Sequence, residues 1–576
     1  MNFNRIPHRL ASGLCATAMG LGAVVGLSPI TSTFAEVEPQ QERPNILVIM
    51  PEDTSAHLGC YGDPLANTPR LDELASRGVR FTNVFTASGV CAPSRASFLT
   101  GMYTESFGAQ HMRTENKNYK SVVPEGVKAF PEWMRAEGYY TFTSGKLDYQ
   151  YSHSLFESGP FTIWDYEDQK YPAEQTDSYT PLWRNREDSE QPFFGEVNFL
   201  TTHESGIIFL KDGTELVTDP SAVELPPYYP DTELARRTMA QHYDNIHMMD
   251  TQVGAVLDML EEDGLADDTI ILFTTDHGDC LPRGKRELYD TGTKVPMILY
   301  VPEKWRTADY EAGSVCDDLI SFVDMAPTIL HMAGIEIPDY MEGQIVFGSD
   351  KAEPRQYVYA ARDRMSEAFY EQKSVRDSRY RHIYNYDFGS GRTGAQHVDY
   401  RDQLDFMQEL WSMHEKGQLT GDQLTWFDVL PEEELYDLEA DPWELHNLAA
   451  DPAYADTLER MRGALKDFLS VYPDSGLTED EMIAAWYPNG VQPITEIPNV
   501  YRSYSDTHTV WLKLEGVTSS SSVGYRIKGV DRDGYWHLYA EPFEVPAGSE
   551  IEVKAVRYGY AESPVITVRL NEQPAS

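Results

Sequence analysis

The chain has 576 residues, more than a single hydrophobic core usually supports, so we expect two or three domains. Its content of 41% hydrophobic residues is typical of a globular protein, and its net charge of −45 is extreme. So acidic a surface argues against nucleic acid and anionic membranes as partners, and an anionic substrate would need a local basic pocket.

The first 35 residues have the pattern of an export signal. Arg5 and Arg9 precede an apolar run from Leu10 to Leu27, and residues 33–35 (TFA) form a small-residue cleavage site. The apolar run is rich in Gly and Ala, which makes it a weak membrane span. We therefore expect a signal peptide at 1–35 that is removed, a secreted or periplasmic mature chain, and no membrane anchor.

Apolar strand-like runs alternate with helical patterns through the first 350 residues. This alternation predicts an α/β domain at 43–350, with a large, mainly parallel sheet flanked by helices on both faces. The expected strands lie at 45–50, 79–86, 139–143, 192–200, 269–275 and 295–301. The expected helices lie at 69–78, 130–138, 234–262 and 322–332.

The pattern changes twice in the rest of the chain. Residues 351–475 carry shorter, mixed segments and end in a helical stretch at 451–472. Residues 490–574 predict a small all-β sandwich, because short runs of strand character are separated by Gly, Ser and Asp turns. Its expected strands lie at 509–514, 523–528, 535–539, 551–558 and 564–570.

The stretch from Val90 to Gly101 (VCAPSRASFLTG) carries the clearest chemistry. It follows an expected strand, and Pro93 suits the first turn of a helix. Cys91 would then lie where free backbone N–H groups and the helix dipole favour an anion, with Arg95 adding positive charge one turn further on. A nucleophile beside an anion cradle suits group transfer from a charged ester.

The spacing Cys-x-Pro-Ser-Arg-x-x-x-Leu-Thr-Gly resembles the signature of the type I sulfatases, in the alkaline phosphatase superfamily. A lone cysteine is usually a small buried hydrophobe, but six further matching positions favour the resemblance. In that family the cysteine becomes formylglycine, made by a formylglycine-generating enzyme or an anaerobic sulfatase-maturating enzyme. Its hydrated aldehyde attacks sulfur. The resemblance covers residues 43–475 and implies an antiparallel-sheet subdomain at 351–475.

A pair of potential metal ligands follows each of two expected strands. Glu52 and Asp53 end the strand at 45–50, and Asp276 and His277 end the strand at 269–275. Functional residues gather at the carboxyl ends of parallel strands, so these pairs can meet near Cys91. Such a set of oxygens with an imidazole suits Ca²⁺ or Mg²⁺. The resemblance implies the same metal ligands together with the modified Cys91, with Glu52 replacing the first Asp of a family Asp-Asp pair.

The resemblance also implies catalytic roles for residues further along the chain. Lys146 matches the family lysine that holds the sulfate and the hydrate, and Lys285 matches that of a Lys-x-x-x-Tyr-x-x-Gly pattern. His203 stands where the family has its general acid, which protonates the leaving oxygen. Asp148 departs from the pattern, because many sulfatases have His there. A carboxylate could accept the same proton, or mark a different sugar-binding subsite.

The sequence thus predicts a secreted sulfatase that hydrolyses sulfate esters of a carbohydrate derived from a polysaccharide. A phosphatase or phosphonate monoester hydrolase of the same superfamily and a non-catalytic carbohydrate-binding homologue remain open alternatives. Residues His111, Arg113, Glu204 and the segment 156–183 are candidates for shaping the sugar pocket. The last part of the chain resembles the C-terminal β-sandwich of chitobiase- or hexosaminidase-type glycosidases, and we expect it to pack against the enzyme rather than bind sugar.

Overall fold

The structure is a computed structural model that describes residues 42–112, 120–151, 159–168, 181–208, 215–308, 310–504 and 508–571. The expected signal peptide, Arg113 and most of the segment 156–183 lie outside these residues. Among the helices of the described residues, none is long and apolar enough to cross a membrane.

A nine-stranded sheet forms the centre of the protein, with β9 beside β2 and the remaining strands in the order β4-β3-β5-β1-β6-β7-β2-β8. Strand β1 pairs in parallel with both β5 and β6, whereas β7 is antiparallel to β6 and β2. The prediction of a mainly parallel sheet is therefore confirmed. The strands are β1 (Asn45–Pro51), β2 (Val79–Phe85), β3 (Tyr140–Ser144), β4 (Tyr166–Asp168), β5 (Phe193–Phe199), β6 (Thr269–Thr274), β7 (Lys294–Tyr300), β8 (Val315–Cys316) and β9 (Ile320–Ser321).

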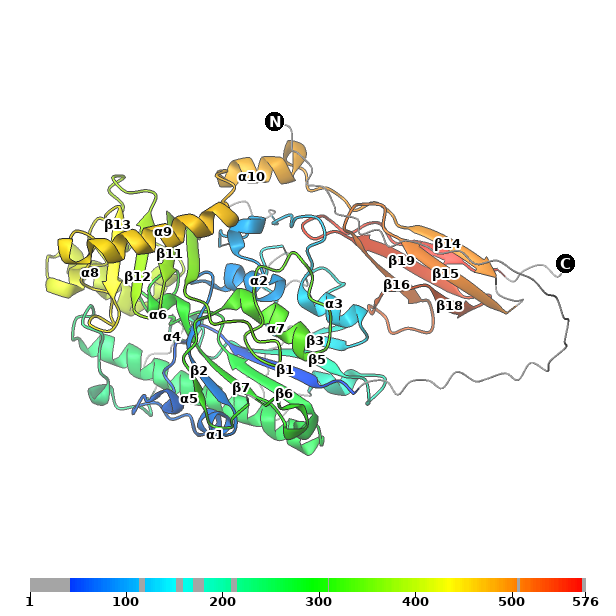
Figure 1. The fold of residues 1–576 in the computed structure, drawn as a ribbon, viewed down its shortest axis with the longest axis horizontal. Coiled ribbons are helices and arrows are strands. Elements are labelled where there is room, and N and C mark those ends of the chain that lie inside the picture. The colour runs from blue at the N-terminus through cyan, green and yellow to red at the C-terminus, as the bar shows by residue number, and fades with distance from the viewer. Residues whose placement is uncertain are drawn as a thin grey trace, which may run out of the picture. The chain divides into compact units, whose positions relative to one another are not determined.

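Helices cover both faces of this sheet (Figure 1). Along β1, Ile46, Val48 and Met50 pack into one hydrophobic core, while Leu47 and Ile49 pack into the other. All five side chains are fully buried, as expected for a continuous apolar strand covered on both sides. Helices α1 and α5 lie on one face, and α2, α3 and α7 on the other. These helices are α1 (Pro69–Arg77), α2 (Cys91–Thr100), α3 (Phe130–Ala136), α5 (Glu233–Glu262) and α7 (Met325–Met332).

A second sheet of four antiparallel strands, in the order β10-β11-β12-β13, follows in the chain. Met461 and Leu465 of α9 pack on Val375 and Leu435 of this sheet, so the predicted helix after it is present. Helices α8 and α10 were not predicted. The elements are β10 (Val358–Met365), β11 (Ala368–Arg376), β12 (Tyr380–Asn385), α8 (Asp405–Glu415), β13 (Glu433–Asp437), α9 (Ala455–Val471) and α10 (Glu479–Trp486).

The C-terminal part is built from two further antiparallel sheets, β14-β15-β18 and β17-β16-β19-β20. Val510 and Leu512 of β15 share a core with Ile551 and Val553 of β19, which joins the two sheets. Strands β14 and β18 were not predicted from the sequence. The strands are β14 (Asn499–Tyr504), β15 (Thr509–Glu515), β16 (Ser522–Ile527), β17 (His537–Leu538), β18 (Phe543–Pro546), β19 (Glu550–Val556) and β20 (Ile566–Arg569).

Glu132 of α3 ties this C-terminal part to the central sheet. Its buried carboxylate accepts hydrogen bonds from Tyr558 Oη, at 2.7 Å, and from the hydroxyls of Ser522 and Thr162. Lys128, one turn earlier, lies 3.6 Å from the Glu132 carboxylate and donates to Ser520 O at 2.7 Å. A buried polar network that is satisfied in this way specifies how two parts pack together.

Candidate active site

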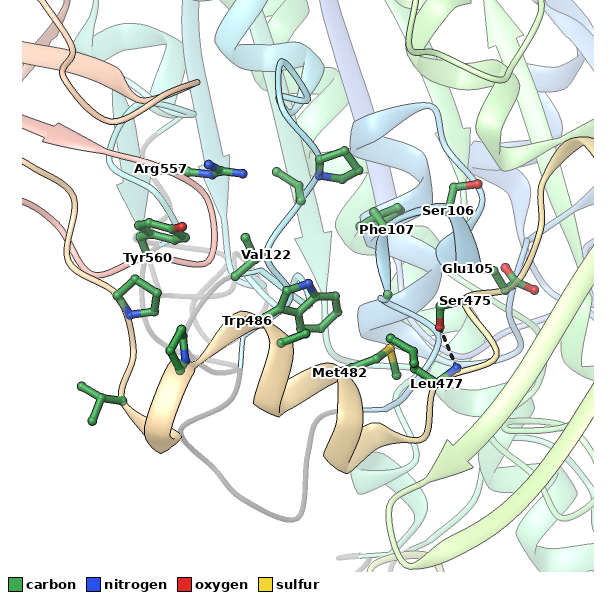
Figure 2. Close-up of a pocket in the computed structure, with 17 residues that line it drawn as sticks. Glu105, Ser106, Phe107, Val122, Ser475, Leu477, Met482, Trp486, Arg557 and Tyr560 are labelled. Carbon is green, nitrogen blue, oxygen red and sulfur yellow. Dashed lines mark hydrogen bonds between the residues drawn. The ribbon is translucent and has the colours of Figure 1, made fainter. Parts of the chain in front are cut away.

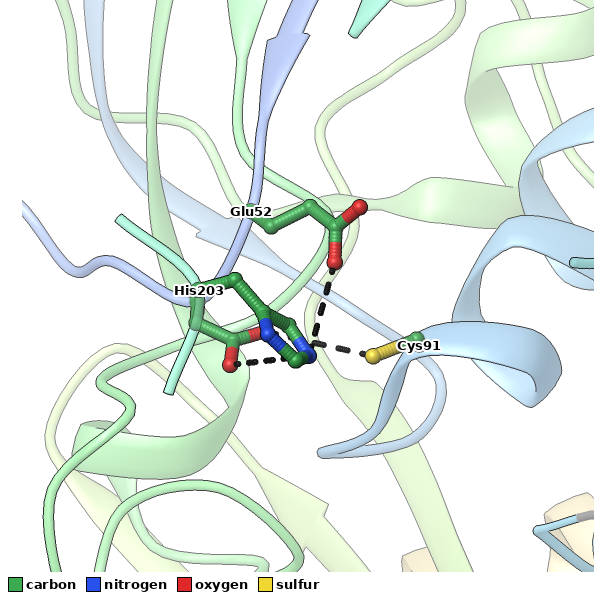
Figure 3. Close-up of side chains that lie close together, drawn as sticks. Glu52, Cys91 and His203 are labelled. Atoms are coloured by element: carbon green, nitrogen blue, oxygen red, sulfur yellow. Dashed lines mark hydrogen bonds and ion pairs between the residues drawn. The ribbon is translucent and has the colours of Figure 1, made fainter. Parts of the chain in front are cut away.

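Cys91 is the first residue of α2 and is buried, with 1% of its surface exposed. Val90 before it is extended and Pro93 occupies the first turn, as the sequence predicted. Every residue of α2 is buried, so the helix is inserted through the protein and presents Cys91 at its N-terminal end. Figure 3 shows the Cys91, Glu52 and His203 side chains converging from three different elements.

The acidic pairs meet at Cys91 because β1 and β6 are neighbouring parallel strands. The Asp53 N–H donates to Asp276 Oδ1 at 3.1 Å, which joins the two strand ends. His277 Nε2 lies 2.9 Å from Asp53 Oδ1 and 3.3 Å from Cys91 Sγ. Asp53 has a φ of 51°, an uncommon value for a residue with a side chain, and strained backbone of this kind often marks a functional site.

These residues fit a hard divalent cation. The ligand atoms of Asp53, Cys91, Asp276 and His277 all lie within 4.8 Å of one another. Glu52 Oε1 is buried and makes no hydrogen bond within the described residues, so it can serve a cation. Burial alone would raise the pKa of Asp276, but His277 and Arg95 lower it to about 2, which keeps this carboxylate ionised. Ionised oxygen ligands are the set that Ca²⁺ and Mg²⁺ prefer.

Arg95 is held rigidly beside the acidic pairs. Its Nε donates to Asp276 Oδ2 at 3.1 Å, and its Nη1 donates to Asn198 Oδ1 at 2.6 Å and Glu196 Oε1 at 3.3 Å. Asn198 and Glu196 lie on β5, next to β1 in the sheet. Neither residue was predicted from the sequence to belong to the site. Their signal was the presence of polar residues inside an otherwise apolar strand.

Two buried lysines complete the charge pattern of the site. Lys146 Nζ lies 2.5 Å from Glu52 Oε2, and Lys285 Nζ lies 2.6 Å from Asp53 Oδ2. Burial would lower the pKa of Lys285, but Asp53 and Cys91 raise it well above its usual range. Burial would likewise lower the pKa of Lys146, but Cys91 and Glu52 raise it above its usual range. Both ammonium groups are therefore charged near neutral pH and can face an anion.

His203 faces the same cluster, with Nε2 at 3.9 Å from both Glu52 Oε2 and Asp53 Oδ2. Its Nδ1 accepts the Ser205 backbone N–H at 3.1 Å, which assigns the proton of the neutral ring to Nε2. Burial and Lys285 lower the pKa of His203 to about 3. The lowered pKa favours a neutral imidazole whose Nε2 faces the carboxylates of Glu52 and Asp53.

Three further residues singled out from the sequence, Asp148, Glu204 and His111, are buried in different surroundings. Asp148 is buried in the loop that follows β3, two residues beyond Lys146. Glu204 forms a two-pronged ion pair with Arg286, at 2.7 and 3.0 Å, and lies 3.1 Å from Lys285. His111 is also buried, and its Nδ1 accepts the Arg364 N–H at 3.4 Å.

A cavity of about 710 Å³ lies elsewhere in the described residues (Figure 2). Trp486 of α10 lines it, together with Arg557 and Tyr560 of the C-terminal part. None of the residues around Cys91 described above lines this cavity. Its position therefore adds nothing to the chemistry of the predicted site.

Sequence comparisons identify the family. The sulfatase family model matches residues 44–335, and the model for the N-sulphoglucosamine sulphohydrolase C-terminal region matches residues 283–392. An ulvan-active sulfatase of Formosa agariphila is 38% identical, with 92% of each chain covered. Human N-sulphoglucosamine sulphohydrolase is 28% identical, with 73% of this chain and 89% of its own covered. The chain belongs to the sulfatase family and is a sulfuric ester hydrolase.

Solved structures share the fold. A 2-O GAG sulfatase has a TM-score of 0.56 at 21% identity, covering 75% of this chain and 93% of its own. A protein solved with its substrate D-glucosamine-2-N,6-O-disulfate has a TM-score of 0.54 at 20% identity, covering 76% of this chain and 100% of its own. A phosphonate monoester hydrolase of Silicibacter pomeroyi also scores 0.54, at 19% identity, covering 76% and 98%. The fold alone does not separate these activities, whereas sequence identity favours the sulfatases.

Proposed function

We propose that the protein removes sulfate from a sulfated polysaccharide or its oligosaccharides, using a formylglycine hydrate made from Cys91 and a bound divalent cation, Ca²⁺ in preference to Mg²⁺. One observation carries the proposal. Cys91 Sγ is buried at the N-terminus of α2, 3.3 Å from His277 Nε2 and 3.9 Å from Asp53 Oδ1. The charged ammonium groups of Lys146 and Lys285 line the same cluster.

The names of the relatives support this substrate class. The most similar of those described above is active on ulvan, and the human relative is named for N-sulphoglucosamine. Both names denote sulfated carbohydrate, so ulvan oligosaccharides are the first substrates to test. A local basic pocket is needed because the net charge of −45 repels a sulfated polyanion at long range.

In the proposed reaction, one hydroxyl of the Cys91-derived hydrate loses its proton to solvent, and its oxygen forms a bond to sulfur while the bond from sulfur to the sugar oxygen breaks. Lys146 and Lys285 neutralise the sulfate oxygens, as preorganised charges do in phosphoryl transfer. A cation held by Glu52, Asp53, Asp276 and His277 would supply further stabilisation of negative charge and lower the pKa of the hydrate.

His203 and Asp148 handle the protons in this proposal. The negative charge of a bound sulfate opposes the effect of Lys285 on the His203 pKa and favours an imidazolium, which would protonate the departing sugar oxygen. The second hydroxyl of the hydrate then gives its proton to Asp148. The carbonyl re-forms as the bond to the sulfate oxygen breaks, which releases sulfate.

The proposal also covers biogenesis and organisation. A formylglycine-generating or anaerobic sulfatase-maturating enzyme would oxidise Cys91, and the segment 1–35 would direct export to a secreted or periplasmic location. The proposed domains are the catalytic α/β domain at 43–350, its C-terminal subdomain at 351–475 and the β-sandwich at 490–574.

Substitution at Cys91 tests this function. Wild-type protein and Cys91→Ala, both co-produced with a maturation enzyme, are incubated with ulvan oligosaccharides, and released sulfate is measured by ion chromatography. The wild type releases sulfate and the variant does not, because it has no aldehyde to hydrate. Equal sulfate release by the folded variant would overturn the proposal.

A further inference from the structure

A second cluster of ligand atoms lies outside the proposed catalytic site. It consists of His57 from the loop after β1, His242 of α5 and Asp279 from the loop after β6, whose ligand atoms lie within 4.8 Å of one another. His57 Nε2 is 3.1 Å from Asp279 Oδ2, and His242 Nε2 is 3.6 Å from Asp279 Oδ1. The proposed reaction uses none of these three side chains.

His242 indicates that the cluster serves a ligand. Its side chain is fully buried, and its Nε2 makes no hydrogen bond within the described part of the chain. The other ring nitrogen, Nδ1, is occupied by Cys280 Sγ at 3.4 Å. A buried imidazole nitrogen that makes no hydrogen bond and only approaches Asp279 Oδ1 at 3.6 Å costs free energy, which a metal ion bound between His242 and Asp279 would offset.

The size of the cluster suits a single small ion. With ligand bonds of zinc length, two donors of one tetrahedron lie about 3.3 Å apart. His57 Nε2 lies 3.1 Å from Asp279 Oδ2, close to this value, whereas His242 Nε2 approaches the other carboxylate oxygen, Oδ1, at 3.6 Å. One ligand atom from each residue lies within 4.8 Å of the others. Two imidazoles with a single carboxylate favour Zn²⁺, whereas the acidic cluster at Cys91 favours Ca²⁺ or Mg²⁺.

The surroundings of His57 are those of a metal-binding histidine. Its Nδ1 lies 3.1 Å from Asp63 Oδ2, and Tyr243 Oη donates to the same oxygen at 2.8 Å. A carboxylate on the far nitrogen typically orients an imidazole that binds metal through the near one. A cavity of about 380 Å³ is lined by His57, Asp63, Tyr243 and Asp279, and so opens on two of the three clustered side chains.

We propose that His57, His242 and Asp279 bind a Zn²⁺ ion distinct from the cation at Cys91. This ion would fix α5 to the loops after β1 and β6. The same loops carry Asp53 and Asp276, and the Cys280 N–H donates to Asp53 O at 3.0 Å. Bound Zn²⁺ would therefore keep Asp53 and Asp276 in place at the Cys91 site without contacting the substrate.

Titration with Zn²⁺, and in parallel with Co²⁺ as a spectroscopic substitute, tests the proposal. The protein is full-length, carries no polyhistidine tag and is first saturated with Ca²⁺ to fill the site at Cys91. Calorimetry and Co²⁺ absorption should show one tetrahedral site in the wild type that is lost in His57→Gln and His242→Asn. His247→Gln is the matched control, because His247 lies on the same helix but bonds to Asn67 O, and it should keep the site.

A further readout, the melting temperature, keeps the test decisive. Zn²⁺ should raise the melting temperature of the wild type and of His247→Gln, and leave that of His57→Gln unchanged. If His242→Asn does not fold, His57→Gln decides, because the His57 side chain is partly exposed and tolerates substitution better. Zn²⁺ binding that is absent in the wild type, or equal in wild type and His57→Gln, overturns the proposal. In that case His57 is an imidazolium held between Asp63 and Asp279.

Discussion

Arg95 and Asp276 form a fully buried ion pair, with Nε 3.1 Å from Oδ2, that ties the helix carrying Cys91 to the end of β6. Because the same guanidinium also reaches Asn198 on β5, one side chain fixes three elements around the site. The planar guanidinium fork of an arginine can donate to several such acceptors at once in fixed directions, whereas the ammonium of a lysine cannot. The pair therefore aligns the nucleophile with the cation ligands.

Arg95→Lys should lower kcat/KM for a sulfated oligosaccharide about 10²-fold, because a lysine loses the fork while keeping the charge. Steady-state sulfate release measures this effect. Asn198→Ala should show a smaller loss, since it removes a single bond to Arg95. Wild-type activity in Arg95→Lys would show that the fork does not position the site.

Lys146→Gln should lower kcat/KM about 10²–10³-fold, because one charge on the sulfate oxygens is lost. It should also destabilise the fold, since Glu52 would be left as a buried carboxylate without its lysine. Sulfate release and thermal unfolding measure the two effects. Lys304→Gln is the control, because this lysine forms an exposed ion pair with Asp268 and should change neither quantity.

His203→Gln should separate substrates by leaving group. For a sugar sulfate, whose alcohol needs a proton to depart, kcat should fall about 10²–10⁴-fold. For 4-nitrophenyl sulfate, whose phenolate departs without one, the fall should be about tenfold or less. Equal losses with the two substrates would assign His203 to binding rather than to proton transfer.

Glu132→Gln should weaken the junction between α3 and the C-terminal part by about 1–3 kcal/mol at pH 7, because a charged acceptor of several buried hydrogen bonds is lost. Burial opposes ionisation of Glu132, but Lys128 and the hydroxyls of Ser522, Thr162 and Tyr558 lower its pKa below the ordinary 4.5. A lowered folded-state pKa contributes stability above pH 4.5, and this stability is lost as the pH falls through the folded-state value.

Urea unfolding at several pH values checks this predicted loss of stability in acid. The difference between wild type and Glu132→Gln should be largest at neutral pH and should narrow in acid. Tyr558→Phe, which removes one of the hydrogen bonds, should show a smaller difference at neutral pH. A gap that widens as the pH falls would contradict the assigned pKa direction.

Much of the fold and the candidate site could be read from the sequence. The apolar runs placed β1, β5 and β6 to within one residue at each end, because strands buried on both faces carry a strong signal. The adjacency of β1 and β6 then brought Asp53 and Asp276 to Cys91. This meeting could be predicted from which residues follow the two strands, without any other structural information.

Other features depend on partners that are distant in the chain. Glu196 and Asn198 are explained by Arg95, about 100 residues away, which nothing in their own strand reveals. Strands β14 and β18 pair with β15, but β14 (NVYRSY) lacks a clear alternation of apolar residues and β18 is only four residues long, so local patterns missed them. The segment 322–332 was predicted as one helix. It begins instead with a short 3₁₀ turn at Phe322–Asp324, where Ser321 and Asp324 cap each other.

The mass of the tryptic peptide 81–95 tests the central claim most directly, because it contains Cys91 and no other cysteine. Protein co-produced with a maturation enzyme should give a peptide about 18 Da lighter than the cysteine form, as replacement of the thiol by an aldehyde requires. A sulfatase of known modification, produced in the same cells, controls for the maturation enzyme. An unmodified thiol in this protein beside a converted control would contradict the account.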